Sequence, residues 1–262
     1  MSSYKIFETH AHYDDEAFDE DRDVLLGSMD ENGIQEVVNV CASIDSLEKT
    51  KALMEKYSFM YGAFGIHPDD AELVTEEVLD KVRECCGLEK AVAVGEIGLD
   101  YYWHKEAGEH ELQKKVFRQQ MEIARELHMP FMVHSREAAA DTLDLVKDCV
   151  NEGMYGGIIH CFSYGKEMAK EYLNMGLYLG IGGVVTFNNA RKVKEVVEYA
   201  PLEQIVLETD SPYLSPVPYR GKRNCSLNLP LVAEEIGRIK GISSEEVVRV
   251  TGDNARRLLL RK

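Results

Sequence analysis

Short apolar runs alternate along the chain with longer stretches in which apolar and polar positions recur at helical spacing, and the alternation repeats about eight times. The short runs are rich in β-branched or aromatic residues and are bounded by Gly, Pro or polar residues, which is typical of β-strands. The predicted strands lie near Tyr4–Glu8, Glu36–Cys41, Ser58–Ala63, Ala91–Val94, Pro130–Val133, Gly156–Ile159, Leu177–Ile181 and Gln204–Leu207.

Stretches long enough for helices lie between these runs. Apolar residues recur at roughly helical spacing in the stretch that begins at Glu111 and again from Ala138 to Val150. Eight strand–helix units in 262 residues indicate an α/β protein with a (β/α)8 TIM barrel, and a doubly wound open sheet is the alternative. We expect a single domain over residues 1–262.

The C-terminal region carries its own helix signals. Ser243 and Glu246 have the spacing of a capping box, which predicts the start of a helix. Gly252 and Asp253 are expected to interrupt this region before a final basic helix from Asn254 to Arg261.

Histidines and carboxylates follow several of the predicted strands at their C-terminal ends. In a barrel these ends meet at one rim, so residues far apart in the sequence would converge on one pocket. This convergence favours the barrel over the open sheet. The candidate metal ligands are His10, His12, Glu96, His134, His160 and Asp210.

These residue types suit a divalent metal ion. His10 and His12 form a His-x-His pair, which on an extended segment points both imidazoles to the same face. Imidazoles with carboxylates bind Zn, Mn and related ions, and one carboxylate, such as Glu96, can bridge two ions through its two oxygens. Each residue alone also has an ordinary structural reading, as a buried ion-pair partner, a strand-end histidine or a turn residue. Their coincidence at one rim favours the metal site.

Other residues near the rim leave two readings open. His67, before Pro68, is either a substrate-binding group or a turn residue. The glycine-rich segment 180–183 lacks the dinucleotide-binding pattern and predicts a strand that a ligand or a neighbouring backbone approaches closely. Cys161 is expected to fill the barrel. The chain has no G-x-S-x-G or P-loop motif, so the chemistry needs no serine or cysteine nucleophile.

The net charge of -16 argues against a wide, sequence-independent grip on nucleic acid, which needs many Lys and Arg contacts to phosphate. Basic residues nevertheless gather locally at the predicted rim, either as a phosphate-binding rim or as ordinary charged surface. Tyr101, Tyr102 and Trp103 are expected to form an aromatic lip, with at least one ring covered by the loop. The basic residues are Arg136, then Arg191, Lys192 and Lys194, then Arg220, Lys222 and Arg223.

The six cysteines form no CxxC pair, which is typical of a reduced cytoplasmic protein. The N-terminus lacks the pattern of a signal peptide, and no apolar run approaches the ~20 residues of a membrane span. We therefore expect a cytoplasmic protein without membrane contact. No amphipathic stretch indicates a dimer interface, so we expect a monomer.

The chain resembles the TatD family of metal-dependent deoxyribonucleases, which are amidohydrolase-like TIM barrels, from end to end. The motifs that carry the resemblance are THAHYDD from Thr9, GIHP from Gly65, GEIGLDYY from Gly95, PFMVHSREA from Pro130, HCFS from His160, ETDSPYL from Glu208, PYRGKRN from Pro218 and TGDNARRLL from Thr251. The resemblance implies two divalent ions (Mg, Mn or Zn), one bound by His10, His12, Glu96 and Asp210 and the other by Glu96, His134 and His160.

The expected activity is 3'-5' exonuclease cleavage of a DNA end or single strand by a metal-activated water. Asp210 and Glu96 are the expected catalytic residues, and the expected substrate-binding residues are His67, Arg136, Arg220 and Lys222. A metal-dependent carbonyl hydrolase, such as a D-aminoacyl-tRNA deacylase, is the alternative, and an inactive binding barrel is a third possibility that the complete ligand set disfavours. The chain departs from the family pattern at Glu8, Tyr164 and Cys225-Ser226, which leaves the ligand set complete but touches two loops near the substrate.

Overall fold

A computed structural model describes residues 5–260 and contains one sheet of eight parallel strands in the order β1 to β8. Tyr4 and Arg261, which begin one predicted strand and end one predicted helix, lie outside the described residues. The strands are β1 (Ile6–Ala11), β2 (Ile34–Val40), β3 (Met60–Ala63), β4 (Ala91–Asp100), β5 (Phe131–Arg136), β6 (Gly157–Ile159), β7 (Tyr178–Ile181) and β8 (Ile205–Leu207).

The sheet curls until its first and last strands meet. The backbone N–H of Asp210, just beyond β8, donates to the carbonyl of His10 at 2.9 Å, and that of His12 donates to the carbonyl of Ser211 at 2.8 Å. A parallel bridge between Ala11 and Ser211 completes the junction. The predicted (β/α)8 barrel is therefore confirmed, and the open sheet is excluded.

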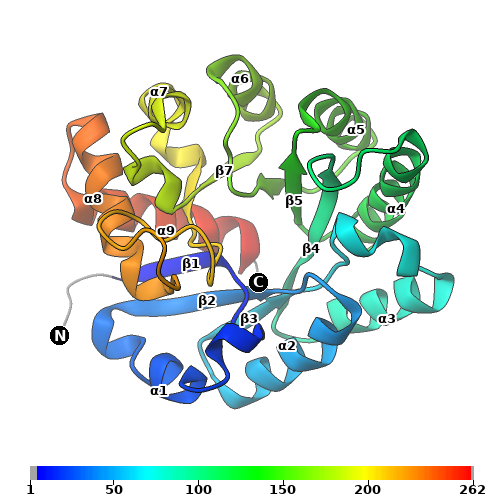
Figure 1. Cartoon of the computed structure of the whole chain (residues 1–262), viewed down its shortest axis with the longest axis horizontal. Coiled ribbons are helices and arrows are strands. Elements are labelled where there is room, and N and C mark those ends of the chain that lie inside the picture. Colours follow the sequence, from blue (N-terminus) through cyan, green and yellow to red (C-terminus); the bar gives the residue numbers. More distant parts are fainter. Residues whose placement is uncertain (1–4, 261–262) are drawn as a thin grey trace.

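Helices surround the strands (Figure 1). The prediction of helices after Glu111 and after Ala138 is confirmed, although α4 begins four residues before Glu111. Within residues 5–260, no helix is long and apolar enough to cross a membrane. The helices are α1 (Arg22–Gly27), α2 (Ile44–Lys56), α3 (Glu76–Cys86), α4 (Ala107–Glu126), α5 (Ala139–Asn151), α6 (Lys166–Asn174), α7 (Arg191–Tyr199), α8 (Leu229–Lys240) and α9 (Ser244–Leu259).

The fourth strand is longer than predicted. It was expected to end at Val94, but β4 continues to Asp100 because its second half pairs with β5, with Gly98 opposite His134 and Asp100 opposite Arg136. Glu96 therefore lies inside a strand rather than after it, which fixes its backbone on both sides.

The predicted interruption at Gly252 and Asp253 is wrong, because α9 is continuous across both residues. The side chain of Ser243 accepts from the backbone N–H of Glu246 at 3.2 Å, which is one half of the expected capping box. A Cβ on Gly252 would stand 3.5 Å from the carbonyl oxygen of Lys5. This is an ordinary contact distance, so the packing of α9 against the start of the chain does not depend on the glycine.

The last helix closes the N-terminal end of the barrel. Ala255, Leu258 and Leu259 of α9 pack in one buried apolar cluster with barrel residues that include Phe7 and Met132. Asn254 and Arg256 also bind this end of the barrel: the Asn254 amide donates to the carbonyl of Ile205 at 2.8 Å, and Arg256 pairs with Glu36 of β2 at 2.7 Å. The opposite, C-terminal end of the barrel is left open for the polar residues.

Candidate metal centre

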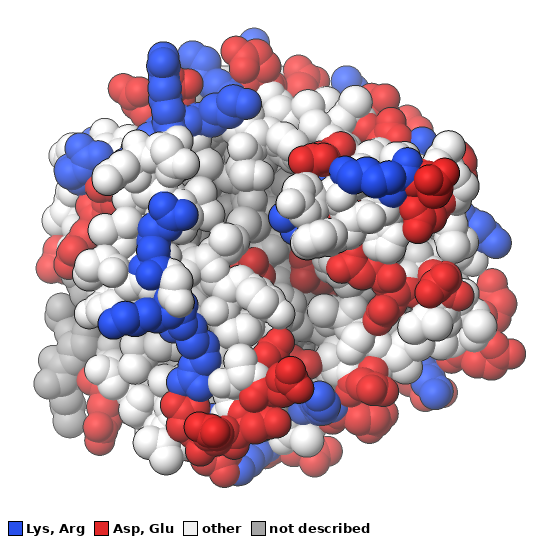
Figure 2. Space-filling view, in the orientation of Figure 1, with Lys and Arg blue, Asp and Glu red and all other residues white. Residues whose placement is uncertain are grey.

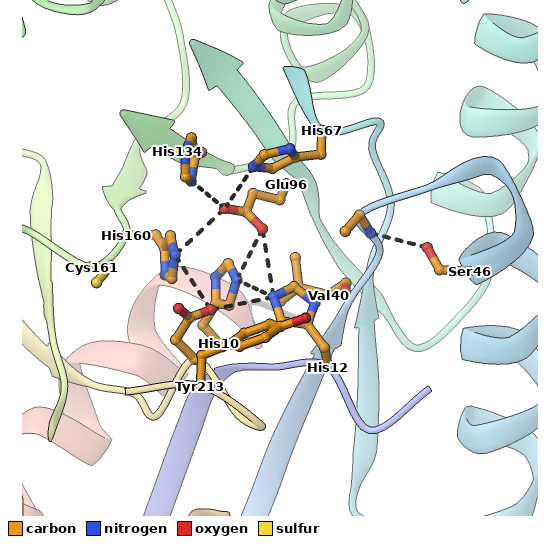
Figure 3. Close-up of polar contacts among 12 residues, drawn as sticks. His10, His12, Val40, Ser46, His67, Glu96, His134, His160, Cys161 and Tyr213 are labelled. Carbon is orange, nitrogen blue, oxygen red and sulfur yellow. Dashed lines mark hydrogen bonds and ion pairs between the residues drawn. The ribbon is translucent and has the colours of Figure 1, made fainter. Parts of the chain in front are cut away.

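Glu96 lies at the centre of a group of histidines at the C-terminal end of the barrel (Figure 3). Its Oε2 is 3.4 Å from Nε2 of His10 and 3.6 Å from Nε2 of His12. Its Oε1 is 2.9 Å from Nδ1 of His134 and 3.5 Å from Nε2 of His160. The two oxygens of one buried carboxylate therefore face two different pairs of imidazoles.

Asp210 lies beside histidines at the ends of the first strand and the sixth. Its Oδ1 is 3.4 Å from Nε2 of His12 and 3.7 Å from Nε2 of His160. The backbone of Asp210 has a positive φ of 59°, a conformation that aspartate tolerates better than most residues. All six predicted ligands are thus brought together from β1, β4, β5 and the segments after β6 and β8.

His67 reaches the same site. Its Nε2 is 4.0 Å from Oε1 of Glu96, and its ring packs edge-on against that of His134. Its Nδ1 accepts from the backbone N–H of Asp69 at 3.2 Å, so it also caps the short 3-10 helix η3 (Pro68–Leu73). His67 is therefore a turn residue, as one interpretation expected, and its ring also lies beside Glu96 and His134.

The donor atoms fit metal ions. In each of several groups of three residues, one imidazole or carboxylate atom per residue lies within 4.8 Å of the others. Buried imidazole nitrogens and carboxylate oxygens gathered at this spacing are the donors that divalent transition metals prefer. The groups nearest to Glu96 are His10, His12 and Glu96; His10, His160 and Asp210; and His67, Glu96 and His134.

Two carboxylates that the sequence analysis missed hold the outer nitrogens of the histidines. Oδ2 of Asp100 is 3.1 Å from Nε2 of His134, and Oε1 of Glu208 is 3.1 Å from Nδ1 of His160. A carboxylate on the second nitrogen of a metal-binding histidine fixes the orientation of the ring and increases its basicity. Both carboxylates stand at or just after the end of a strand, which is the only signal in the sequence that could have identified them.

Glycines give Glu208 the room to lie where it does. A Cβ on Gly180 would clash with the Glu208 carboxylate, and one on Gly182 would stand 3.1 Å from the Glu208 carbonyl oxygen. Oε1 of Glu208 also accepts from the backbone N–H of Cys161 at 2.5 Å. The predicted close approach to this glycine-rich strand is confirmed, and the approaching group is Glu208.

Ionisation of the carboxylates is favoured by the imidazoles around them. Burial opposes the charge on Glu96, but the positive potential of His160 and the hydrogen bond with His134 lower the pKa of Glu96 well below its ordinary value. Burial also opposes the charge on Asp210, and its contacts with His12 and His160 lower the pKa of Asp210. Both carboxylates are therefore ionised and available as ligands or bases near neutral pH.

The imidazoles divide into two kinds. Burial disfavours their charged forms, but neighbouring carboxylates outweigh it and raise the pKa of His12 to about 10 and that of His134 and His160 to about 9. Burial and the neighbouring His160 instead lower the pKa of His10. Without metal, His12, His134 and His160 are therefore protonated near neutral pH, and a metal ion would have to displace these protons.

The basic residues at the mouth differ in whether they are ion-paired. Arg223 forms a two-pronged pair with Asp21, at 2.6 and 2.7 Å, so it is not available for phosphate. Within residues 5–260, no carboxylate lies within ion-pairing distance of Arg136, Arg220 or Lys222, which instead lie over aromatic rings. Figure 2 shows the mouth as a hollow, with Lys and Arg beside it and a dense group of Asp and Glu below.

The second predicted basic group is mostly neutralised. Arg191 pairs with Glu195 at 2.7 Å and Lys194 pairs with Glu235 at 3.1 Å, whereas Lys192 has no carboxylate within ion-pairing distance in the described part of the chain. This group therefore offers fewer unpaired positive charges for a phosphate than Arg220 and Lys222 do.

Two further predictions have different outcomes. Tyr101 is partly covered, bound to Asp141 at 2.7 Å and stacked on His110, as expected for one ring of the aromatic lip. The expectation that Cys161 fills the barrel stays a prediction. The residue is half-buried just after β6, and its sulfur lies within 4.8 Å of ligand atoms of His160 and Glu208, so it borders the metal centre.

Two departures from the expected family pattern contact each other. The Glu8 carboxylate is buried and accepts from Ser226 Oγ at 2.9 Å and from the backbone N–H of Thr209 at 2.9 Å. Tyr164, the third departure, shares a hydrogen bond of 2.8 Å with Ser135 of β5. These residues therefore join the loops at the mouth to the barrel.

The barrel and its buried histidine–carboxylate cluster define a metal-dependent hydrolase. Residues 7–260 match the family model described as TatD related DNase. The chain belongs to the TatD family.

Relatives and a solved structure agree with this placement. The "uncharacterized metal-dependent hydrolase YabD" of Bacillus subtilis (strain 168) is 40% identical over 97% of this chain and 98% of its own. The "3'-5' ssDNA/RNA exonuclease TatD" of Cronobacter sakazakii is 29% identical over 93% of this chain and 94% of its own. The crystal structure of YJJV, a TatD homolog from Escherichia coli K12, superposes with a TM-score of 0.91 at 25% identity, covering 98% of this chain and 99% of that chain.

Proposed function

We propose that this protein is a deoxyribonuclease that binds two divalent ions, Mg, Mn or Zn, and removes nucleotides from the 3' end of a DNA strand. The observation that supports two ions is the position of Glu96, whose two oxygens face different imidazole pairs. One ion would be held by His10, His12, Glu96 and Asp210, and the other by Glu96, His134 and His160.

The ions, when bound, acidify water and stabilise the charge that develops on a phosphate. Asp210 is the base: it is ionised beside His12 and His160, and the oxygen that does not bind the ion can accept the proton of a water that attacks phosphorus. The bond from phosphorus to the leaving sugar oxygen breaks, and that oxygen takes a proton from solvent. Glu96 and the histidines hold the reacting groups in place.

The substrate is a nucleic acid end, bound at the mouth by positive charge. Arg136, Arg220 and Lys222 carry charges that no carboxylate within residues 5–260 neutralises, in a chain whose net charge is -16. A few unpaired cations around one hollow suit a short or end-bound strand rather than a long duplex. The name of the Cronobacter relative supports the same substrate class. We expect the protein to act as a monomer in the cytoplasm.

The test is release of nucleotides from single-stranded DNA by metal-stripped protein that is re-supplied with Mg, Mn or Zn. We expect release with at least one ion and its loss in His134→Asn. The matched control is His128→Asn: His128 is exposed, lies just before β5 at the opposite end of the barrel, and has a φ of 52° that asparagine tolerates.

Ion binding without any nucleotide release would contradict the nuclease proposal. The same cluster would then be tested on a carbonyl substrate, with D-aminoacyl-tRNA as the first choice. Equal loss of activity in His128→Asn and His134→Asn would instead indicate a general effect on folding.

A further inference from the structure

The turn after β4 is attached directly to the metal centre. Oδ2 of Asp100 faces Nε2 of His134 at 3.1 Å, while Oδ1 of the same carboxylate accepts from the backbone N–H groups of Tyr102 at 2.8 Å and Trp103 at 3.2 Å. One carboxylate thus orients a proposed metal ligand and fixes two aromatic residues beside it. The rings of Tyr102 and Trp103 are therefore held next to the place where a phosphate would bind.

These rings remain open to solvent although they are held in place. Trp103 is 65% exposed and Tyr102 is 39% exposed, and their rings meet edge to face at a centroid distance of 4.6 Å. Within residues 5–260, the Trp103 indole makes no hydrogen bond. A large ring that is held by an edge-to-face contact and is still mostly exposed at a polar mouth is a surface on which another flat group can stack.

A cation lies over the same rings. The Arg136 guanidinium is 3.9 Å from the centroid of Tyr102 and 5.7 Å from that of Trp103. Arg136 follows His134 by two residues on β5, and its backbone stands opposite that of Asp100 in the sheet, so the backbone that carries the guanidinium is fixed beside the metal centre. The guanidinium covers one face of Tyr102, so the open stacking face is the indole of Trp103. An exposed indole beside a cation that no carboxylate in the described chain neutralises suits a flat base joined to a phosphate.

We propose that Trp103, with Tyr102 and Arg136, forms a stacking shelf for an unpaired nucleobase of the substrate strand, beside the phosphate at the metal centre. The proposal rests on the nuclease function proposed above. A base inside a duplex has both faces covered by its neighbours, so only an unstacked base presents a face to the indole. The shelf therefore selects single-stranded or frayed ends.

The chain provides its own reporter, because Trp103 is the only tryptophan. The probe is a tetrathymidylate with phosphorothioate linkages, added to the metal-loaded protein, and the reference is the same backbone with abasic sugars. We expect the tetrathymidylate to quench the tryptophan fluorescence and to bind roughly tenfold more tightly than the abasic strand. The abasic strand should leave the fluorescence unchanged.

Trp103→Ala should reduce tetrathymidylate affinity to that of the abasic strand, measured by anisotropy of a labelled strand, and leave the abasic affinity unchanged. Tyr199→Ala is the matched control, because Tyr199 is 42% exposed at the end of α7, just before β8 at the opposite end of the barrel. Equal unfolding temperatures of the two variants would exclude misfolding as the cause.

The outcomes separate this shelf from the function on which it rests. Cleavage of single strands, without quenching and with equal affinity for base-containing and abasic strands, would overturn the shelf and leave the nuclease intact. Absence of both binding and cleavage of nucleic acid would overturn the nuclease proposal, and the shelf with it.

Discussion

The two ends of the barrel are built from opposite kinds of residue, although the same strands form both. At the C-terminal end, buried carboxylates and imidazoles surround Glu96. At the N-terminal end, the apolar face of α9, which includes Leu258, packs against apolar strand residues. Charged groups removed from water are costly unless they are paired, whereas apolar burial stabilises at about 25 cal/mol per Å².

This difference indicates that the two ends of the strands have different roles. The N-terminal end supplies stability, and the C-terminal end uses part of that stability to hold ligands and bases away from water. Substitutions at the two ends should therefore have opposite signatures. At the mouth they should reduce the turnover of each folded molecule, and under α9 they should remove stability with little loss of turnover per folded molecule.

The largest effect on activity is expected from Glu96→Gln. Loss of the shared negative charge should reduce turnover by about 10³-fold or more, since charge stabilisation at the reacting phosphate contributes several kcal/mol. The unfolding temperature of the metal-free protein should fall at pH 7, because the variant lacks the counter-charge of the protonated His134 and His160, so turnover is compared per folded molecule. Turnover and thermal unfolding check this expectation.

The control for this variant lies at the other end of the same strand. Glu89 is exposed and precedes β4, so Glu89→Gln should leave turnover unchanged. A Glu96→Gln enzyme with near-normal turnover would show that this carboxylate is not at the centre of the chemistry.

The substitution that should reduce stability rather than activity is Leu258→Ala, at the N-terminal end of the barrel. Leu258 is buried between α9 and the strands, so truncation should lower the free energy of unfolding by about 2–5 kcal/mol. Turnover per folded molecule should stay within about twofold, measured below the unfolding transition after denaturant titration. Leu127→Ala, at a partly exposed leucine, is the matched control. A large loss of turnover in folded Leu258→Ala would contradict the claim that the N-terminal end contributes stability and not activity.

A smaller effect is expected from Glu208→Gln. Glu208 holds Nδ1 of His160 and the backbone N–H of Cys161, so loss of its charge should weaken metal binding by roughly 10–100-fold. Calorimetric titration with Mn²⁺ measures this change. Unchanged metal affinity would mean that Glu208 supports only the loop and not the ligand.

A further expected effect is on the pH dependence of metal binding, at up to about tenfold per pH unit for each proton released. The pKa values of His134 and His160 are raised to about 9, so both are protonated at pH 7 without ions, and binding must release those protons. Metal affinity should therefore increase from pH 6 to 9, and calorimetry should detect the released protons. His10 should release none, because its pKa is lowered.

Stability should respond with the opposite sign in the metal-free protein. A histidine whose pKa is raised on folding adds stability below its unfolded pKa of about 6.5, and that stability is lost as the pH rises through the folded value. Metal-free protein should thus lose stability between pH 6.5 and about 9, the pKa of His134, while metal-loaded protein should not. A metal-free protein that gains stability over this range would contradict the assigned protonation.

The sequence predicted the fold and the clustering of the six candidate ligands because the C-terminal ends of all strands of a barrel lie at one rim. His10 and Asp210 are 200 residues apart, yet each stands at the end of a strand. Once the strands were located, their convergence followed from the parallel order alone.

What the sequence did not reveal depends on contacts between side chains. Asp100 and Glu208 look like ordinary strand-end carboxylates until the ring of a histidine is placed beside each. Arg223 looked as available for phosphate as Arg220 until the pairing with Asp21 was visible. Gly252 looked like a helix break because the burial of α9 on both sides of it, from Val247 to Leu259, has no local signature.

The most direct test of the shared carboxylate is electron paramagnetic resonance of metal-stripped protein titrated with Mn²⁺, beside the Glu96→Gln variant. Two ions bridged by Glu96 predict two Mn²⁺ per chain and an exchange-coupled spectrum that the variant lacks. A single ion per chain, or two ions with the uncoupled spectrum of isolated Mn²⁺ in the unaltered protein, would contradict a centre built around Glu96.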